Sequence, residues 1–579
     1  MRPMDVKQRE ITPQPGVRAH RACAFFGAVS LLLSLSTWSE IGSLGPFIEA
    51  APVALVAYRS DLGEAGAVDH PVGVVAEPHR PTTLRLSSGD AAAWLVDGGA
   101  PNRGASGDDA ACEHVFAVPG ATATVVATAR KIVRKTATYE FTVFVKYVRR
   151  ELRALTSKDR AAFLESMHVV WALETSAGKK SYGDDYRGLD YFAEKHLRGS
   201  AALVNAETAL HYWDYVEDDA RHGGAFRRSE IFDDDWFGAL PPSNSSAKAI
   251  PRGPWAYARL PTGSRYGNAH GLARAPWNVD GAPFVRRSAA RRVASPAELA
   301  RTSRRGRSDR VLDSRPFPTL PGCAEFEACY AETTFAATME CTHRRCMNGL
   351  THGSVHVNVG GHWGVDATIF DELGWTTHRE QFLLIAKGLW RKGLVTFRPD
   401  ARYSRERLNE SGALDYVATL ANVSALNATD ELWARLHAAF CAIGTVGEMY
   451  TSASPTDPTF WVVHPNLERL LMRKRLYLDG FDETWGYARN ARTASDTGLV
   501  CDWSAVDREH DADCAPAVCP GHGADDALPF RGLFGDNATV SNAAFYAATH
   551  PLDAALPYAY DALHWAACGA ASPLALGNG

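Results

Sequence analysis

The sequence lacks a strong excess of charge of one sign, and it lacks the motifs of several large protein classes. The formal net charge of the 579-residue chain is -5, so nothing overall favours a nucleic-acid partner. No internal repeat and no glycine-rich phosphate loop is present. Charged residues make up 22% and hydrophobic residues 46%, a globular balance that excludes wholesale disorder. A chain of this length is expected to form several domains.

Cysteine is unevenly distributed along the chain. Nine of the eleven cysteines fall between Cys323 and Cys568, a density that favours an oxidising compartment over the cytosol. Five N-x-S/T glycosylation sequons agree with this compartment. They begin at Asn244, Asn409, Asn422, Asn427 and Asn537.

Residues 1–40 resemble a targeting segment. Arg18 and Arg21 precede the uncharged, mostly apolar stretch 22–39, and a basic flank before a short apolar core is typical of a cleaved signal peptide. A signal anchor stays open, because about 18 uncharged residues approach the length that spans a bilayer. The protein is therefore expected in the secretory lumen or outside the cell, with membrane contact only through this segment.

Residues 51–150 are predicted to form a small all-β module of the sandwich type. Short β-rich runs are separated by clusters of Gly, Pro, Asp and Ser. The expected strands are Pro52–Tyr58, Thr82–Leu86, Ala91–Val96, His114–Ala127 and Thr138–Tyr147.

Residues 151–486 mix helical patterns with long irregular stretches. Thr156 and Ser157 are suitable N-cap residues for a helix that includes Ala161–Trp171. The stretch 286–310 holds nine arginines against two acidic residues. It is interpreted as a disordered insertion, with an exposed processing loop or an anionic docking patch as alternatives. Residues 487–579, rich in cysteine and turn residues, are expected to form a disulfide-rich tail.

The strongest candidate site begins at His352-Gly-Ser-Val-His356, followed by Gly360-Gly361. Histidines at i and i+4 lie on one face of a helix, where both imidazoles can reach one ion. Imidazole suits copper, zinc, iron or nickel, so the pair alone does not select the metal. The zinc-protease motif needs Glu after the first His, and Gly353 excludes it.

A third ligand is offered by Asp457-Pro-Thr-Phe-Trp-Val-Val-His464. Asp and Pro suit the start of a helix, and the apolar residues that follow suit a buried face. A single buried histidine is more often a hydrogen-bonded core residue. Three histidines in two such contexts favour a shared metal site of His352, His356 and His464.

These motifs resemble the second copper site of the tyrosinase family of type-3 copper proteins. The family pattern is H-x-x-x-H before Gly-Gly, and then D-P-x-F-x-x-x-H. Further similarity is found in Ala209–Tyr215, which is close to L-P-Y-W-D-W, and in Asp234–Gly238. The context Gly447–Pro455 is similar to a long-insert branch, and the resemblance covers residues 147 to 486 and includes the cysteine-rich tail.

The resemblance implies a multidomain protein: a small all-β sandwich-like module, a mainly α-helical type-3 copper core with long loops, and the tail. It implies two copper ions, each on three histidines, the second on His352, His356 and His464. Together the coppers would bind dioxygen and oxidise small phenols or catechols to quinones. All-nitrogen ligation accommodates both copper oxidation states without burying carboxylate charge.

The first copper site departs from the family pattern. His196 is the best candidate ligand there, but the interval between it and Tyr212-Trp-Asp is too short for the remaining ligand helix. His168 is interpreted as structural, His211 stands where the family has proline, and His222 is a loop residue without an assigned partner. A missing segment, a true pseudoenzyme and substitution by unrelated histidines all stay open.

Two further departures concern activity. Gly353 stands where many monophenol-hydroxylating members carry Asn, and Val463 stands where many have a second His. Both weaken the case for phenol hydroxylation relative to catechol oxidation. Because the first copper site lacks expected ligands, the chain is expected to fail with monophenols and to show little or no catechol oxidation. The alternatives are a non-catalytic secreted glycoprotein that binds one copper, and a mononuclear zinc enzyme using the same three histidines.

The cysteines before the first histidine motif are expected to form disulfides among themselves. Cys323, Cys329, Cys341 and Cys346 are separated by short loops, and cross-links there would hold the ligand helix rigidly. Four cysteines allow three connectivities, so the partners stay undetermined.

Overall fold

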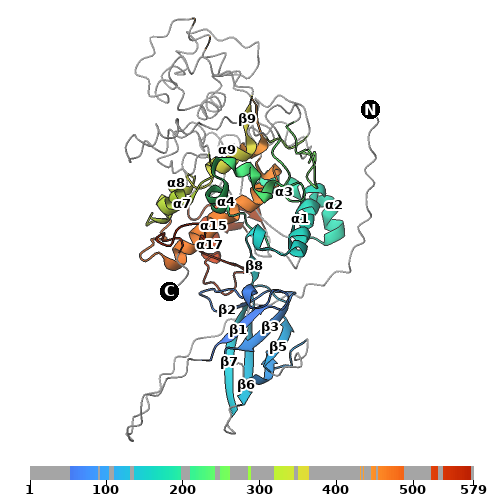
Figure 1. The fold of residues 1–579 in the computed structure, drawn as a ribbon, viewed down its shortest axis with the longest axis vertical. Helices are drawn as coiled ribbons and strands as arrows, with labels where there is room; N and C mark the ends of the chain where they lie inside the picture. The colour runs from blue at the N-terminus through green and yellow to red at the C-terminus, as the bar shows by residue number, and fades with distance from the viewer. Residues whose placement is uncertain are drawn as a thin grey trace.

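A computed structural model places a β-rich N-terminal region below a region of helices (Figure 1). It describes residues 53–88, 91–102, 110–130, 136–196, 209–241, 248–260, 284–287, 319–343, 350–363, 431, 435, 445–450, 454–487, 523–531 and 539–575. The N-terminal targeting segment, the five sequons and the cysteines of the tail before Cys568 lie outside these residues. In the part of the chain described, no helix combines the length and apolarity needed to cross a bilayer.

Two sheets form the N-terminal module. The three-stranded sheet has the order β1 (Leu55–Arg59), β3 (Pro81–Leu86), β5 (Ala111–Val115). The four-stranded sheet has the order β2 (Val74–Ala76), β7 (Thr136–Val145), β6 (Thr122–Arg130), β4 (Ala91–Val96). Alternate side chains of both sheets share one hydrophobic core, in which Leu84, Val125 and Val143 are fully buried. The predicted β-rich module is confirmed.

Two of the predicted strands are divided in the structure, and the first two differ from the prediction by one to three residues at their ends. The run His114–Ala127 is divided into β5 and β6, because Pro119 has no N–H to donate and Gly120 adopts a positive φ of 79°. The run Thr138–Tyr147 is divided at Lys146. After it, β8 (Tyr147–Arg149) pairs in parallel with β13 (Tyr558–Tyr560), near the C-terminus.

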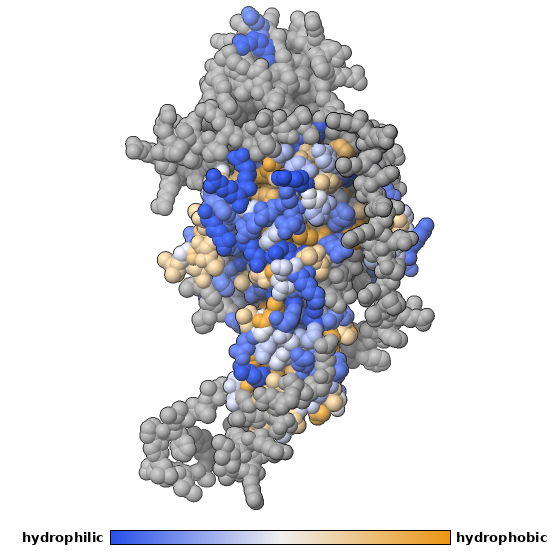
Figure 2. Space-filling view, turned by 45° about the vertical axis from the view of Figure 1, so that its right-hand side comes forward, coloured by the Kyte–Doolittle hydropathy of each residue, from blue (hydrophilic) through white to orange (hydrophobic). Residues whose placement is uncertain are grey.

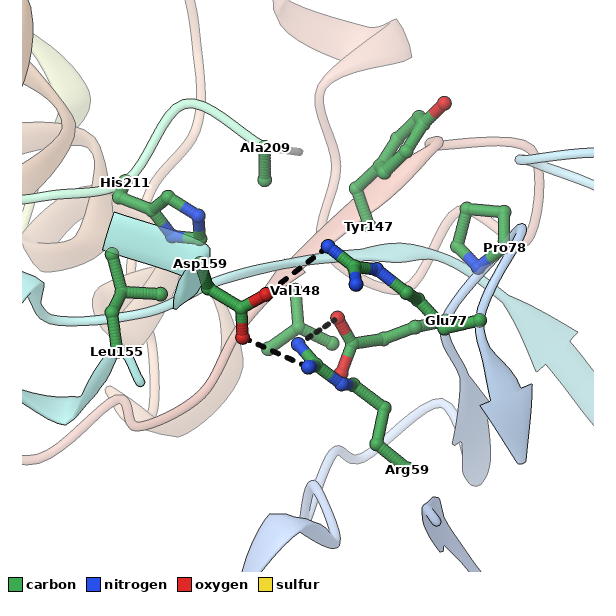
Figure 3. A pocket seen from close by; sticks show the side chains of 10 residues that line it. Arg59, Glu77, Pro78, Tyr147, Val148, Leu155, Asp159, Ala209 and His211 are labelled. Carbon is green, nitrogen blue, oxygen red and sulfur yellow. Dashed lines mark hydrogen bonds and ion pairs between the residues drawn. The ribbon is translucent and has the colours of Figure 1, made fainter. Parts of the chain in front are cut away.

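Buried ion pairs join the β module to the first helix, α1 (Ser157–Ala172). The hydroxyl of Thr156 accepts a hydrogen bond from the Asp159 N–H, so the predicted N-cap is confirmed. The Asp159 carboxylate also accepts from Arg59 at 2.8 Å and from Arg80 at 3.1 Å. These groups line a small pocket with His211, and none of the three motif histidines lines it (Figure 3).

The remaining helices gather above β8 (Figure 1). Their bounds are α2 Thr175–Tyr182, α3 Leu189–His196, α4 Tyr215–His222, α7 Cys323–Tyr330, α8 Phe335–His343, α9 Gly353–Gly360, α15 Phe460–Tyr477 and α17 Asn542–Ala548. A second core fills the space between them and includes Trp213, Phe326, Val355 and Trp565. Hydrophilic side chains dominate the face of this region seen in Figure 2, with hydrophobic ones between them.

The short paired strands and 3-10 helices of this region connect the helices. The strands are β9 His362–Trp363, β10 Thr445–Val446, β11 Ala527–Arg531 and β12 Thr539–Ser541. The 3-10 helices of the whole described chain are η1 Glu64–Gly66, η2 Leu152–Ala154, η3 Gly223–Arg228, η4 Glu230–Phe232, η5 Glu448–Tyr450 and η6 Ser454–Thr456. Pairing of β9 with β10 brings the residues after the first histidine motif beside η5.

The Tyr-Trp-Asp segment, Tyr212-Trp213-Asp214, and the following Tyr215 form hydrogen bonds both to α15 and to the residues just before α9. The Trp213 N–H donates to the Val462 carbonyl at 2.8 Å, and the Tyr215 hydroxyl donates to the Thr351 carbonyl at 2.8 Å. The Asp214 carboxylate accepts from Arg469 at 2.9 Å. This motif therefore supports the two helices that carry the histidines.

The disulfides differ in part from the prediction. Cys329 is bonded to Cys341 as expected within the group, whereas Cys323 is bonded to Cys568. The prediction that Cys323 pairs inside the group is wrong, because α7 packs against the C-terminal segment, where the rings of Phe326 and Trp565 lie 5.4 Å apart. The fourth member, Cys346, lies outside the described residues.

The start of the arginine-rich stretch is ordered. Arg286 and Arg287 form part of the buried interior, with exposed fractions of 2% and 0%. The prediction of a disordered insertion is therefore wrong for these two residues. The Asp457 carboxylate neutralises the Arg287 guanidinium, as described below. The backbone N–H of Arg286 donates to the Glu448 carboxylate. Residues 288–310 lie outside the described residues.

Candidate metal centre

The structure brings His352, His356 and His464 together. His352 is the N-cap of α9, His356 lies one turn further on the same helix, and His464 lies in the second turn of α15. One ring nitrogen from each histidine lies within 4.8 Å of the other two. The ring centroids are 5.1 to 5.6 Å apart. One ion can contact all three side chains.

Backbone carbonyls fix the tautomer of each imidazole. The acceptors are the carbonyl oxygens of Thr342, Met449 and Phe460, at 3.0, 2.7 and 2.9 Å from Nδ1 of His352, His356 and His464, respectively. A carbonyl oxygen can only accept, so each Nδ1 carries the proton and each Nε2 carries the lone pair. Histidines that bind metals characteristically donate their other ring N–H to a carbonyl or carboxylate. A neutral ring in this tautomer has Nε2 as the nitrogen that can bind a metal.

The site is largely apolar and enclosed. His352 and His356 are buried, and His464 is half-buried. The Phe460 ring lies 4.0 Å from the His464 ring, measured between centroids. Fully buried Val355 belongs to the same core. The group of three contains no carboxylate, so a bound cation would retain its full charge.

The glycines after the first motif allow the backbone to approach closely. Gly361 ends α9 with a φ of +74°, which favours glycine. A Cβ on Gly360 would lie 2.5 Å from the Tyr450 nitrogen. The absence of that Cβ lets η5 lie against α9, and so the Met449 carbonyl reaches His356.

A buried ion pair fixes the start of the helix that carries His464. Both carboxylate oxygens of Asp457 accept from Arg287, at 2.6 and 2.7 Å. Asp457 Oδ1 also accepts from the Thr459 N–H at 2.9 Å. Arg287 donates further to the carbonyls of Phe237 and Gly238. The aspartate of the D-P-x-F motif therefore links α15 to the Asp-Asp-Trp-Phe-Gly segment.

His168, His211 and His222 are not part of this group. The His168 ring packs edge-on against Trp255, with centroids 5.5 Å apart, and His211 Nδ1 accepts from the Arg150 N–H at 3.0 Å. Their predicted non-ligand roles stay predictions. His222 lies beside Asp218, with Nε2 3.7 Å from Oδ1.

His196 is the last residue of α3, and its side chain lies outside the described part of the structure. Its helix packs near α15, because the rings of Phe192 and Trp461 lie 5.4 Å apart. Among the described residues, the three motif histidines form the one group of three imidazoles. The predicted ligand role of His196 stays a prediction.

The donor set fits copper. Three neutral imidazole nitrogens suit copper and zinc, and the apolar surroundings suit an ion that changes its oxidation state. Comparison with protein-family models and with curated proteins finds no match for this sequence. The case for the site therefore depends on its residues and their geometry.

The sequence did not reveal the groups that position the histidines. The carbonyls of Thr342 and Met449 have no side-chain signature, and Arg287 lies in a stretch whose composition suggested disorder. The Gly360-Gly361 pair was a usable signal, because glycine after a helical motif indicates a helix end or a close backbone approach.

Proposed function

We propose that this chain is a copper-dependent oxidoreductase of the tyrosinase or catechol-oxidase type. The observation that carries the proposal is the convergence of three imidazoles, whose Nδ1 atoms are bonded to backbone carbonyls and which each place one ring nitrogen within 4.8 Å of the other two. His352, His356 and His464 would hold the copper. Copper at such a site exchanges single electrons and, paired with a second copper, supports the reduction of dioxygen.

The chain's own residues would position the copper ligands and limit the access of water. The Thr342, Met449 and Phe460 carbonyls orient the rings. The Phe460 ring lies against His464 and provides an apolar surface near the site. A small aromatic substrate, a catechol rather than a monophenol, agrees with an apolar surface and with Gly353 and Val463 in the motifs.

A second candidate function is a non-catalytic glycoprotein that binds one copper. It is favoured by the surroundings of His168 and His211, which contact Trp255 and Arg150 and form no further group of imidazoles among the described residues. A single copper cannot deliver two electrons to dioxygen in one encounter. This candidate predicts copper binding without turnover.

Oxygen uptake separates the two functions. The full chain, exported and loaded with copper, is assayed with a catechol and with a monophenol, beside the His464→Gln variant. We expect slow uptake with the catechol, none with the monophenol, and none with the variant. Copper binding without uptake would favour the second candidate. Rapid turnover of both substrates would show that further histidines complete a first copper site.

A further inference from the structure

A second group of potential metal ligands lies apart from the three histidines. Asp218 and His222 are one turn apart on α4, and Glu230 begins the 3-10 helix η4. One ligand atom from each lies within 4.8 Å of the other two. Residues at i and i+4 share one face of a helix, so α4 presents both side chains to the same point.

Two buried atoms in this group lack hydrogen-bond partners among the described residues. Asp218 is fully buried with an exposed fraction of 0%, and its Oδ1 accepts no hydrogen bond. Nε2 of His222 also has no hydrogen-bond partner, and 3.7 Å separates these two atoms. Leaving a buried polar atom unsatisfied is unfavourable, so a missing partner between them is indicated.

Further carboxylate oxygens of Asp218 and Glu230 already accept hydrogen bonds from neighbouring side chains. Oδ2 of Asp218 accepts from the Trp213 indole N–H and from Arg153. Oε1 of Glu230 accepts from Arg153 at 2.8 Å. Hydrogen bonds of this kind orient carboxylates that bind metals, and they direct Asp218 Oδ1 toward His222.

We propose that Asp218, His222 and Glu230 form a second metal site, for a divalent ion such as Zn²⁺. Zinc binds histidine nitrogen and carboxylate oxygen at about 2.0–2.2 Å, so two tetrahedral ligands lie roughly 3.3–3.5 Å apart. The 3.7 Å between Nε2 and Oδ1 is close to this separation. One nitrogen and two oxygen donors suit zinc, and exposed parts of His222 and Glu230 leave a path for the ion.

The local charge favours a cation. The guanidinium of Arg153 faces four carboxyl groups, those of Glu151, Glu217, Asp218 and Glu230. Arg221 supplies the second positive charge, close to two of the same groups. Burial raises the pKa of Glu151 to about 7. Without Glu151, three carboxylates still face two guanidinium groups, an excess of negative charge.

A bound ion would link the two ends of the segment between His222 and Glu230. The 3-10 helix η3 (Gly223–Arg228) runs from His222 toward Glu230 and begins at Gly223, whose φ is +50°. A metal that joins both ends would fix this loop beside Trp213, and so beside the Tyr-Trp-Asp segment. The simpler alternative is an ion pair between a protonated His222 and Asp218, without any metal.

Zinc titration of the full chain tests the proposal. Wild type is stripped with a chelator and titrated with Zn²⁺ by calorimetry, and bound zinc is counted by elemental analysis. The variants are His222→Gln, Glu230→Gln and, as a matched control, His550→Gln. His550 also lies 3.7 Å from a carboxylate, that of Glu483, but no third potential ligand joins them among the residues that the structure describes.

We expect His222→Gln and Glu230→Gln each to bind one zinc fewer than wild type, with affinity at that site reduced more than about 100-fold. His550→Gln should match wild type. The titration is repeated with His356→Gln and His464→Gln combined, so that failure of the three-histidine site is seen separately. Circular dichroism checks that each variant is folded. Equal zinc in wild type and His222→Gln would overturn the proposal and leave the ion pair.

Discussion

Arg287 and Asp457 form a bidentate ion pair in which neither side chain is exposed to solvent. The pair joins residue 287, near the start of the arginine-rich stretch, to residue 457, which lies three residues before the first residue of α15. Because His464 lies on α15, the pair holds the helix that carries this histidine at its N-terminal end. A residue outside both histidine motifs therefore contributes to the geometry of the site.

Removal of Arg287 is expected to destabilise the protein strongly. In Arg287→Met the Asp457 carboxylate stays buried without its partner, which costs about 3–5 kcal/mol of unfolding free energy. Replacing both residues, as Arg287→Met with Asp457→Leu, should cost less than the single change. Urea unfolding of the full chain measures both.

The matched control for this pair is Arg252→Met. Arg252 pairs with Asp234, but its side chain is 76% exposed, so the loss should stay below about 1 kcal/mol. Equal losses for Arg287→Met and Arg252→Met would contradict the importance assigned to the buried pair.

Gly360→Ala should weaken both the fold and metal binding. The added Cβ would lie 2.5 Å from the Tyr450 nitrogen, and the strain of overpacking costs about 1–3 kcal/mol. Relief of this contact moves the Met449 carbonyl away from His356. Thermal unfolding and copper titration measure the two effects. Gly569→Ala, where the Cβ meets nothing within 4 Å, should change neither quantity.

Acid should destabilise the protein through His211. Burial, together with the charge of Arg150, lowers the pKa of His211 to about 3. Between pH 3 and 6.5 the unfolded chain binds a proton that the folded chain does not, so stability falls as the pH falls. From pH 7 to pH 5 this loss is about 2 kcal/mol.

The variant His211→Gln keeps an acceptor for the Arg150 N–H and removes the titrating group. Its unfolding free energy should fall by about 2 kcal/mol less than that of wild type between pH 7 and pH 5. Above pH 7.5 the two proteins should respond alike. Identical acid sensitivity would show that His211 is protonated in the folded state.

The disulfide between Cys323 and Cys568 joins positions 245 residues apart. Peptide mapping without reduction should find these two cysteines in one linked peptide pair, and Cys329 linked to Cys341. Cys323→Ser with Cys568→Ser should cost about 2–5 kcal/mol of stability. The buried thiol of Cys112 should react with alkylating reagents only after unfolding. Free Cys568 in the folded protein would contradict this pairing.

Local patterns in the sequence predicted several elements, whereas most distant contacts, apart from the convergence of His464 on His352 and His356, were not predicted. The i, i+4 spacing of His352 and His356 and the N-cap at Thr156 depend on helix geometry alone. Their counterparts in the structure follow the same local rules. The strand break at Gly120 was a missed local signal, since Pro-Gly indicates a turn.

The contacts of Arg287 and Cys568 could not be read from the sequence for a physical reason. Each depends on the packing of segments more than a hundred residues apart in the chain. Composition around Arg287 favours disorder, and the buried carboxylate of Asp457 and the carbonyls of Phe237 and Gly238 reverse that preference. The backbone carbonyls that orient the histidines carry no sequence signal at all.

Copper analysis of the purified full chain tests the central claim most directly. Elemental analysis after loading and desalting should find copper bound at His352, His356 and His464, with the loss of one equivalent in each single His→Gln variant. His550→Gln serves as the control and should keep the wild-type ratio. A wild-type chain without copper, or His464→Gln with undiminished copper, would contradict the account.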